Sequence, residues 1–578
     1  MDNTTTQTIS LLWPEGGDAT AAMGNRAVLR HDRAATDLGL DALASALSIE
    51  PRYSDAAKTI LGTLCDQPDV IRYRHDVLDD FLNCPGLATA LEAQLPSLAQ
   101  LGYIGDAHRA QETQLHQAVS RLGELELYVE CVKQFKALLV AAGENLQSPA
   151  LRRLRDVLIA READPSFQAL AAELPALGVA VRSIRSVTIG INLDPQLLPV
   201  EATLLAINAQ RFKGASASVS LLGKLLGANS SDDYQGIAQL HSVPLATARS
   251  GIPSSNGQHA YPLLVPLFKD INDVLESVAK PVLKALTRYI KHNGQFLTAL
   301  EAQIAFYLGA AKLIERLRTA GLPICRPEVL PVDERICAVK DAYNINLALR
   351  LLDRQPGMNL SAQIITNDVD FGAEGRIFIL TGPNQGGKTT YTQAAGLLQL
   401  LCQAGLYVPG SSARISPVDA IFTHFPVEER PSLEAGRLGE EVKRLGDIFT
   451  RATRHSLVLL NESLSSTSPG EGLYLARDVV RALKLLGTRV IFATHLHELA
   501  ADLAAFNAAH AGDSKVVSLV ARSVKDAVAG TDADSARRTY KIQPGPPEGL
   551  SFARDIAARY GLSFEQLEKT LQERRVIP

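Results

Sequence analysis

Cysteine, net charge and long hydrophobic runs are all scarce in this chain of 578 residues. Its six cysteines are scattered without a C-x-x-C pair, which argues against a disulfide framework or a zinc site and indicates buried thiols in a reducing compartment. The formal net charge of −4 creates no strong field toward nucleic acid, so DNA binding would need a local patch. The first residues lack the basic and apolar regions of a signal peptide, and no apolar run approaches the roughly 18 residues of a membrane span. We therefore expect a cytoplasmic protein without membrane contact.

The length predicts several domains, and the 46% of hydrophobic residues supports large buried cores. Residues 1–35 show no clear periodicity and are interpreted as a loosely packed leader. Residues 36–185 are predicted to be mostly helical, and the 3, 4, 3 spacing of Leu122, Leu125, Val129 and Val132 predicts a coiled-coil-like seam that serves packing and not a partner site. Residues 186–262 are predicted to form a small, partly β insert, because V-T-I-G-I-N-L-D alternates and turn residues become frequent. Helical patterning resumes over residues 263–344. From residue 345 to residue 578 strand-like runs alternate with helices, which predicts a mainly parallel α/β sheet.

The most specific chemical signal lies in residues 376–391, R-I-F-I-L-T-G-P-N-Q-G-G-K-T-T-Y. A strand-like run is followed here by the phosphate-loop pattern G-x-x-x-x-G-K-[ST]. Its glycines let backbone N–H groups surround phosphate oxygens, Lys388 would reach the outer phosphates, and Thr389 would bind Mg²⁺ where the next helix begins. The predicted nucleotide-binding residues of the loop are Gly382, Pro383, Asn384, Gln385, Gly386, Gly387, Lys388, Thr389 and Thr390. We therefore expect ATP and Mg²⁺ to bind.

Two further predicted strands, residues 456–460 and 489–493, also end in polar residues. Asn461 stands where an acidic residue usually helps to hold the metal shell, and the next residue, Glu462, is the candidate base for the attacking water. His495 follows the second strand and either senses the γ-phosphate or has a structural role. Because the carboxyl ends of parallel strands meet at one sheet edge, Lys388, Glu462 and His495 are predicted to lie there together as catalytic residues.

A basic stripe is predicted on one helix face, formed by Lys280, Lys284, Arg288 and Lys291. These residues either lie along the phosphate backbone of DNA or form an ordinary solvated surface. Their spacing alone does not separate the two interpretations.

Several motifs together resemble the MutS family of DNA mismatch-repair ATPases. They are T-G-P-N-Q-G-G-K-T-T-Y, the N-E strand with T-S after it, and F-A-T-H-L-H-E-L at residues 492–499. I-R-Y-R-H-D-V-L-D-D-F and S-V-T-I-G-I-N-L-D are similar to the helical lever and core region of that family, and T-Y-K-I-Q-P-G to its C-terminal dimerisation end. The resemblance implies a multidomain α and α/β protein: a helical lever region with a clamp-like insert, then an ABC-type P-loop ATPase domain with a C-terminal helical dimerisation segment.

The same resemblance assigns roles to further residues. It places Asn367 near the adenine and Ile364 where an aromatic residue stacks on the base. It assigns Gly436 and Glu441 to an element that reaches the nucleotide of a partner subunit, which implies a homodimer. The function that it implies is an ATP-gated clamp on DNA.

The departures from the family pattern argue against mismatch recognition. None of the 16 phenylalanines is followed two places later by Glu, so the F-x-E wedge is absent. Residues 1–35 leave no room for the mismatch-reading and connector domains, and no Smr-type nuclease domain follows, so a truncated member is expected.

Two other functions compete with the DNA clamp. A protein that dimerises with nucleotide and acts on a protein partner is the alternative, which the near-neutral charge favours. A transporter ATPase subunit is disfavoured, because L-S-G-G-Q is absent and a long helical region precedes the phosphate loop.

Overall fold

The structure of the protein is a computed structural model, which describes residues 9–14, 29, 33–107, 114–182, 186–197, 199–210, 280–289, 294–383, 385–426, 437–509, 513–524, 537–547, 562 and 564–574. The chain divides into two compact units. Unit 1 comprises Met1–Ala93, Leu138–Leu154 and Ala299–Pro578, and unit 2 comprises Gln94–Ala137 and Arg155–Thr298. The chain therefore crosses between the units several times, along long helices.

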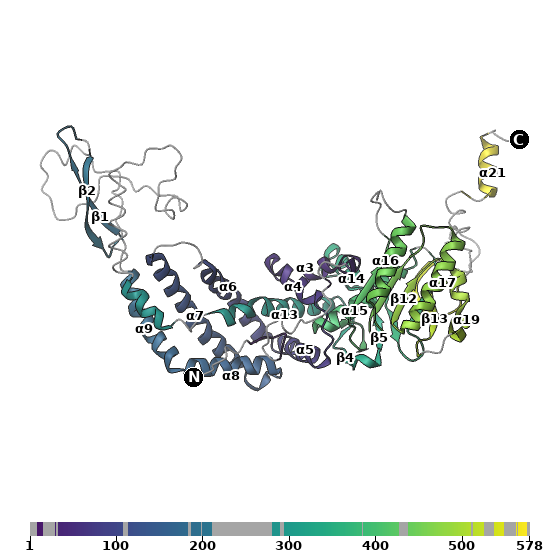
Figure 1. Cartoon of the computed structure of the whole chain (residues 1–578), viewed down its shortest axis with the longest axis horizontal. Helices are drawn as coiled ribbons and strands as arrows, with labels where there is room; N and C mark the ends of the chain where they lie inside the picture. The colour runs from purple at the N-terminus through teal and green to yellow at the C-terminus, as the bar shows by residue number, and fades with distance from the viewer. Residues whose placement is uncertain are drawn as a thin grey trace. The chain divides into compact units, whose positions relative to one another are not determined.

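Long helices dominate the helical part of the chain (Figure 1). They are α6 (Pro85–Ala107), α7 (Gln114–Ala142), α8 (Pro149–Ala163) and α9 (Pro165–Arg182). In unit 2 the predicted seam of α7 is buried, with Leu122, Leu125, Val129 and Val132 all below a tenth exposed. Tyr128 on the same helix packs edge-on against the rings of Phe167 and Phe296. The seam is thus packing inside unit 2.

A β-hairpin begins where the alternating V-T-I-G-I-N-L-D pattern predicted strand. β1 (Ser186–Leu193) and β2 (Pro199–Asn208) pair antiparallel, with Ser186 opposite Asn208. The rest of the predicted insert, from residue 211 onward, lies outside the described residues.

Unit 1 opens with the short helices α2 (Arg33–Asp37), α3 (Leu40–Ala46) and α4 (Ser54–Gly62), which are followed by the longer helix α5 (Pro68–Asn83). Single 3-10 turns occur at η2 (Pro51–Tyr53), η3 (Gly143–Asn145), η4 (Thr287–Tyr289) and η5 (Val332–Glu334). Gly39 joins α2 to α3 in the left-handed region, with φ 66°, and the side chain of Asn346 donates a hydrogen bond to the carbonyl of Leu38.

The expectation of a loosely packed leader is wrong for residues 9–14. Leu11 is fully buried and Trp13 is 6% exposed, with the Arg74 guanidinium 4.4 Å from the centre of the Trp13 ring. Arg74 also donates to the carbonyl of Leu12, and the Gln303 side chain accepts from the N–H of Leu11. The segment has no helical or strand period because side-chain hydrogen bonds, not a ladder, satisfy its backbone.

Helix α13 (Gln295–Thr319) corrects a second expectation, because by length and composition alone it is long and apolar enough to cross a membrane. Within the protein, 61% of its most apolar window is buried. Leu300, Ile304 and Leu308 face other parts of the fold at 2% exposure or less. The helix therefore serves as a core helix here.

The central sheet of unit 1 has six strands in the order β10-β11-β12-β7-β13-β14. These strands are β7 (Ile377–Thr381), β10 (Ile421–His424), β11 (Leu457–Asn461), β12 (Arg489–Ala493), β13 (Val516–Val524) and β14 (Arg537–Pro544). The first five run parallel, as the sequence pattern predicted, and β14 is antiparallel to β13. The strand before the phosphate loop, β7, therefore lies beside β12 and two places from β11.

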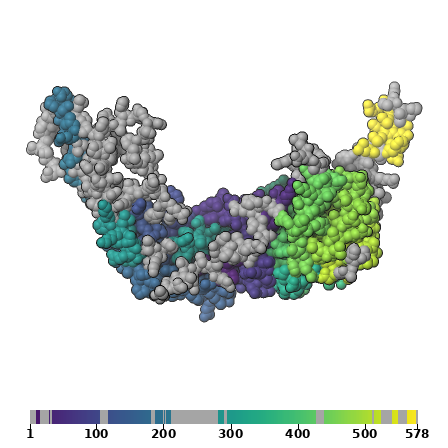
Figure 2. Space-filling view, in the orientation of Figure 1, coloured from purple at the N-terminus to yellow at the C-terminus, as the bar shows by residue number. Residues whose placement is uncertain are grey.

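Helices cover both faces of this sheet (Figure 1). Figure 2 shows the outer surface of this part of the chain in green to yellow. On one face α16 (Arg437–Arg451), α17 (Pro469–Leu486), α18 (His497–Ala501) and α19 (Leu503–Ala509) share a buried core with Ile379, Leu460 and Phe492. On the other face lies α15 (Lys388–Ala404), where Gly396 packs against Leu459. The strands are apolar on both faces because helices cover both.

Smaller sheets and two more helices complete the described part. β4 (Glu328–Val329), β9 (Ser412–Ile415), β5 (Cys337–Ala342) and β6 (Asn367–Phe371) form one sheet, and β3 (Ile324–Cys325) pairs with β8 (Val408–Pro409). α14 (Ile345–Arg354) is capped by the side chain of Asn344, which accepts from the N–H of Leu347, and α21 (Phe564–Glu573) is the last helix.

Candidate nucleotide-binding site

The loop between β7 and α15 has the backbone shape that its glycines predict. Gly382 and Gly387 adopt φ values of 139° and 94°, which L side chains rarely adopt. A Cβ atom at Gly382 would lie 2.7 Å from the Cβ of Ala521, so this position also lacks the space for a side chain. Gly387 is the N-cap of α15, and the loop therefore leads directly into a helix N-terminus, which favours an anion. Asn384 lies outside the described residues.

Lys388 projects into the centre of this loop. Its Nζ donates to the carbonyls of Gly382 at 3.0 Å and Pro383 at 3.1 Å and lies 3.4 Å from Nε2 of His495. Lys388 is 4% exposed, and burial lowers its pKa while the carboxylate of Glu462 acts in the opposite direction. The ammonium is thus held among loop oxygens, where phosphate oxygens would meet it.

The polar residues after β11 and β12 converge on the loop, as predicted. The hydroxyl of Thr389 donates to Oδ1 of Asn461 at 3.1 Å. Glu462 Oε1 lies 3.1 Å from Nε2 of His495. The hydrogen bond with His495 lowers the pKa of Glu462 and outweighs the opposing effect of burial. The carboxylate is therefore ionised at neutral pH and able to accept a proton.

A cavity of about 510 Å³ opens beside these residues. Lys388, Thr389, Thr390 and Glu462 line its polar side, and further lining residues include Tyr343, Asn344, Leu347, Ile365, Asn367, Gln385, Gly386, Gly387, Tyr391 and Tyr540. Such a volume is within the range of small-molecule sites.

The prediction for Ile364 needs correction, because this side chain is buried at 3% exposure and does not line the cavity. Its neighbour Ile365 does, at 37% exposure. The side chains of Ile364 and Ile365, just before β6, point in different directions. An offset of one residue therefore decides whether a side chain lies in the core or lines the cavity.

Asn367 does line the cavity, but both ends of its amide are engaged by β14. Its Nδ2 donates to the carbonyl of Tyr540 at 3.0 Å, and its Oδ1 accepts from the N–H of Ile542 at 2.7 Å. This pairing holds Tyr540, which has a left-handed φ of 54°, next to Gly387. A Cβ atom on Gly387 would lie 3.6 Å from the Tyr540 ring. Sequence reasoning missed Tyr540 because the residue comes from a strand far along the chain.

Of the two candidate partner-contact residues, the structure describes Glu441. Gly436 lies outside the described residues. Glu441 sits near the start of α16 and accepts a hydrogen bond from the hydroxyl of Ser466 at 2.8 Å, in the loop that follows Glu462. Its carboxylate is therefore tied to the nucleotide edge of its own chain.

The basic stripe is described over residues 280–289, in unit 2, and Lys291 lies outside the described residues. Lys280 and Lys284 are exposed on a helical stretch. Arg288 follows on η4 and pairs with Glu173 at 3.8 Å. Lys280 and Lys284 thus lie one helical turn apart on an exposed face, as the spacing predicted.

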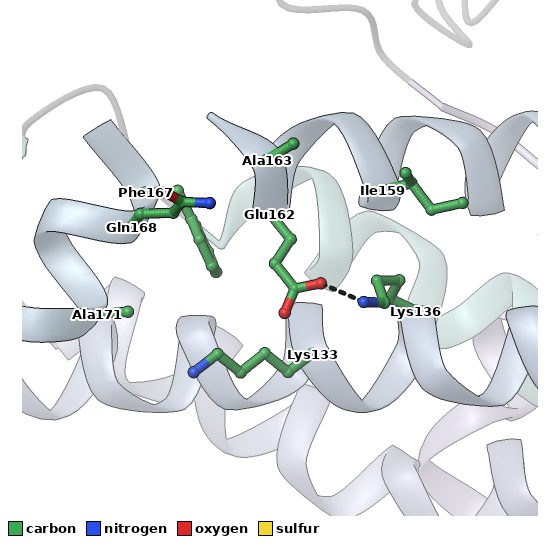
Figure 3. A pocket seen from close by; sticks show the side chains of 8 residues that line it. All are labelled: Lys133, Lys136, Ile159, Glu162, Ala163, Phe167, Gln168 and Ala171. Atoms are coloured by element: carbon green, nitrogen blue, oxygen red, sulfur yellow. Dashed lines mark hydrogen bonds and ion pairs between the residues drawn. The ribbon is translucent and has the colours of Figure 1, made fainter. Parts of the chain in front are cut away.

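A second cavity, of about 540 Å³, lies within unit 2 among α7, α8 and α9. Figure 3 shows the Glu162 carboxylate directed at Lys136 of the neighbouring helix, while Lys133 points away from this pair. The remaining wall is formed by Ile159, Phe167, Gln168 and two alanines. The cavity combines one ion pair, a second lysine and a glutamine with apolar surface, and its lining holds no metal-binding group of residues.

The geometry of the loop, the Lys388 ammonium and the sheet edge defines a P-loop nucleotide-binding protein. A family model described as MutS domain V matches residues 378–548, and a model described as MutS2 N-terminal domain matches residues 66–320. Together these matches cover both the central sheet and most of the helical part. The chain is therefore similar to MutS-family proteins over these two ranges.

Individual relatives agree with this assignment over part of the chain. An "Endonuclease MutS2" of Pelotomaculum thermopropionicum is 31% identical over 36% of this chain and 25% of its own length. A "DNA mismatch repair protein MutS" of Chlorobaculum tepidum is 32% identical over 37% of this chain and 24% of its own. "DNA mismatch repair protein Msh6" of Gallus gallus is 34% identical over 31% and 14%. The chain thus matches at most a quarter of the length of these relatives.

Proposed function

We propose that this protein binds and hydrolyses ATP at the edge of its central sheet. The observation that carries the proposal is the convergence of two separate segments beside the cavity: the start of α15 brings Lys388 and Thr389, and the end of β11 brings Asn461 and Glu462. ATP hydrolysis needs a cation for the phosphates, here Lys388, oxygen ligands for the metal, here Thr389 and Asn461, and a base for the attacking water, here Glu462.

Phosphate binding would use the loop and the helix behind it. The N–H groups that open α15 have no partner within the helix, and its dipole favours an anion at this end. Lys388, which donates to two loop carbonyls, would exchange them for the outer phosphate oxygens. Since both arrangements leave the ammonium hydrogen-bonded, the exchange leaves no buried donor unpaired.

The residues present fit Mg²⁺, which prefers oxygen ligands. Thr389 Oγ1 and Asn461 Oδ1 are 3.1 Å apart at the same edge, and they are the two groups that would hold the ion or its water shell. When bound, Mg²⁺ would neutralise charge on the phosphates. Because Asn461 supplies oxygen without charge, we expect slow hydrolysis and a long-lived ATP-bound state.

Proton transfer would fall to Glu462. Its ionised carboxylate would accept the proton of the attacking water, while His495 orients the carboxylate through their 3.1 Å contact. His495 also lies 3.4 Å from Lys388, and it therefore stands between the base and the phosphate-binding cation.

The substitution Glu462→Gln tests this assignment. It should nearly abolish turnover and leave ATP bound, as measured by phosphate release and by equilibrium ATP binding. Glu374→Gln is the matched control, because Glu374 is exposed and pairs only with Lys515 at 3.6 Å among the described residues. Turnover at the parent rate in Glu462→Gln would refute the mechanism.

The protein is further proposed to act as a homodimer. Leu562, Phe564 and Leu567, in and just before α21, are 60%, 75% and 40% exposed, and α21 has no buried residue. Helical spacing places Phe564 and Leu567 on one face, and a second copy would cover this apolar face. A monomer in light scattering at micromolar concentration, with and without ATP, would count against a dimer.

DNA is the proposed partner, bound through its backbone and without mismatch preference. The support is the exposed pair Lys280 and Lys284 together with the similarity to MutS-family proteins. Affinity for DNA should fall steeply with salt concentration. Lys284→Glu should lower the slope of this salt dependence by about one phosphate contact, whereas Lys515→Glu in unit 1 should leave the slope unchanged. A clear mismatch preference would refute the claim, and absence of binding to any DNA at low salt would favour a protein partner instead.

A further inference from the structure

The turn that presents Glu462 has an unusual backbone. Glu462 and Leu464 both adopt left-handed conformations, with φ values of 50° and 64°. Such values are uncommon for residues other than glycine, and they persist only where surrounding contacts enforce them. Part of the enforcement is visible: Leu464 is anchored in the core at 3% exposure, and the N–H of Glu462 donates to the carbonyl of Ala493 at 2.8 Å.

The residue between these two, Ser463, is held by a single partner at two points. Its Oγ lies 2.7 Å from Nδ1 of His424 and 3.2 Å from the carbonyl oxygen of the same residue. If the Ser463 hydroxyl donates to the carbonyl of His424, it accepts from Nδ1–H, so the hydroxyl, Nδ1 and the carbonyl oxygen are all paired. Ser463 and His424 are 3% and 1% exposed, so water does not compete for either bond.

His424 is well placed for this contact. It is the last residue of β10 and lies opposite Leu460 of β11, so its ring is delivered to the place where the chain leaves β11. Burial, reinforced by the charge of Arg444, lowers the pKa of His424 to about 4. The imidazole is therefore neutral at physiological pH, with one ring N–H available for Ser463.

We propose that His424 and Ser463 form a positioning pair, which holds the left-handed turn from which Glu462 reaches His495 and the cavity. The pair touches no reacting group, and its role rests on the proposed function, in which Glu462 is the base. A carboxylate displaced by about 1 Å can lose on the order of a hundredfold in rate, so two buried hydrogen bonds in the neighbouring residue suffice to control catalysis.

Two substitutions remove the contact, and two variants serve as comparisons. Ser463→Ala deletes the hydroxyl with little change of volume, and His424→Leu deletes the ring nitrogens. His424→Asn keeps an N–H at about the position of Nδ1. Ser518→Ala is the matched control, because Ser518 is a buried serine of β13 whose hydroxyl has no hydrogen-bond partner among the described residues.

The measurements are kcat and KM for ATP, equilibrium binding of ATP, and the thermal midpoint. Ser463→Ala and His424→Leu should lower kcat by roughly tenfold to a hundredfold with ATP affinity unchanged. His424→Asn should restore much of kcat, and Ser518→Ala should match the parent. A purely structural role would instead lower the thermal midpoint and the amount of ATP bound, and leave kcat per folded molecule intact.

The outcomes separate this proposal from the one on which it rests. If Glu462→Gln is inactive while Ser463→Ala and His424→Leu turn over at the parent rate, the positioning pair is refuted and the base stands. If Glu462→Gln is active, the base assignment fails first. Should His424→Leu fail to fold, Ser463→Ala decides the question alone.

Discussion

Charged side chains cluster at both edges of the central sheet, where its strands begin and where they end. The surroundings of the two clusters differ. At the carboxyl edge, Lys388 and Glu462 face a cavity, and the backbone there is left-handed at Glu462. At the amino edge, Arg489 opens β12 with a fully buried side chain, and Arg376 precedes β7 with 9% exposure. The strands are shared, so the difference between the edges must come from what surrounds the charges.

Backbone carbonyls surround the charges of the amino edge. Arg489 donates to the carbonyls of Ser416 at 2.9 Å and Pro417 at 3.1 Å, and to two others. Asp513 accepts from Arg335 and from Arg454, and burial raises its pKa less than these guanidinium groups lower it. These groups connect loops to strands, and none of them lines the cavity beside Lys388 or the cavity of unit 2.

The comparison shows that buried charge alone does not mark a functional site. Both clusters contain groups with shifted pKa values and a non-glycine residue with left-handed backbone, Glu462 at one edge and Arg335 at the other, but only the carboxyl edge combines them with a cavity. The carboxyl edge should therefore control turnover, and the amino edge should control stability.

Removing the cation of the carboxyl edge should have the largest effect. Lys388→Ala should lower turnover by roughly a hundredfold to a thousandfold or abolish it, because the charge that meets the phosphates is lost. Its thermal midpoint should stay near that of the parent, and Lys340→Ala, at an exposed position, should behave like the parent. Unchanged ATP binding and hydrolysis would overturn the site and the comparison with it.

The opposite result is expected for Arg489→Met at the amino edge. This substitution keeps much of the volume but leaves several buried carbonyls without a donor, which should cost about 3 kcal/mol of unfolding free energy. The urea midpoint measures the loss, and ATP affinity per folded molecule should not change. Arg454→Met, at a side chain 55% exposed, is the control, with little expected effect. A large kcat defect in folded Arg489→Met would show that the edges are not independent.

Acid should act on the two edges over different pH ranges. His424 in the folded protein binds a proton only below about pH 4, whereas its ordinary pKa is 6.5, so its contribution to stability is complete above pH 6.5 and is lost as the pH falls toward 4. The pKa of Asp513 is lowered from its ordinary value of 3.8, so the contribution of Asp513 to stability is lost only as the pH falls below 3.8. Urea midpoints from pH 7 to 4 should therefore decline less in His424→Asn than in the parent, and Asp513→Asn should leave the slope unchanged. Equal slopes in parent and His424→Asn would contradict this.

The smallest effect is expected from restoring charge beside the metal position. Asn461→Asp should raise turnover by up to roughly tenfold or lower the Mg²⁺ concentration needed, because a carboxylate stabilises the ion better than an amide. The measurement is phosphate release over a Mg²⁺ titration. If neither quantity moves, another group compensates, and Asn461 is not the cause of slow hydrolysis.

The sequence alone was enough to predict the strand–loop–helix unit, three parallel strands and the meeting of Lys388, Glu462 and His495 at one edge. These features depend on local period, on glycine conformations and on the rule that parallel strands end together. The buried seam of α7 was predicted for the same reason, since helical spacing fixes which residues share a face.

Only the tertiary structure decided features that depend on chain segments distant in sequence or on a single step in register. Ile365 instead of Ile364 lines the cavity because adjacent side chains before β6 diverge, and Tyr540 reaches Gly387 only after β14 pairs with β13. The contact of His424 with Ser463 likewise requires β10 to lie beside β11. No local pattern encodes these contacts, because each joins residues that become neighbours only when the sheet forms.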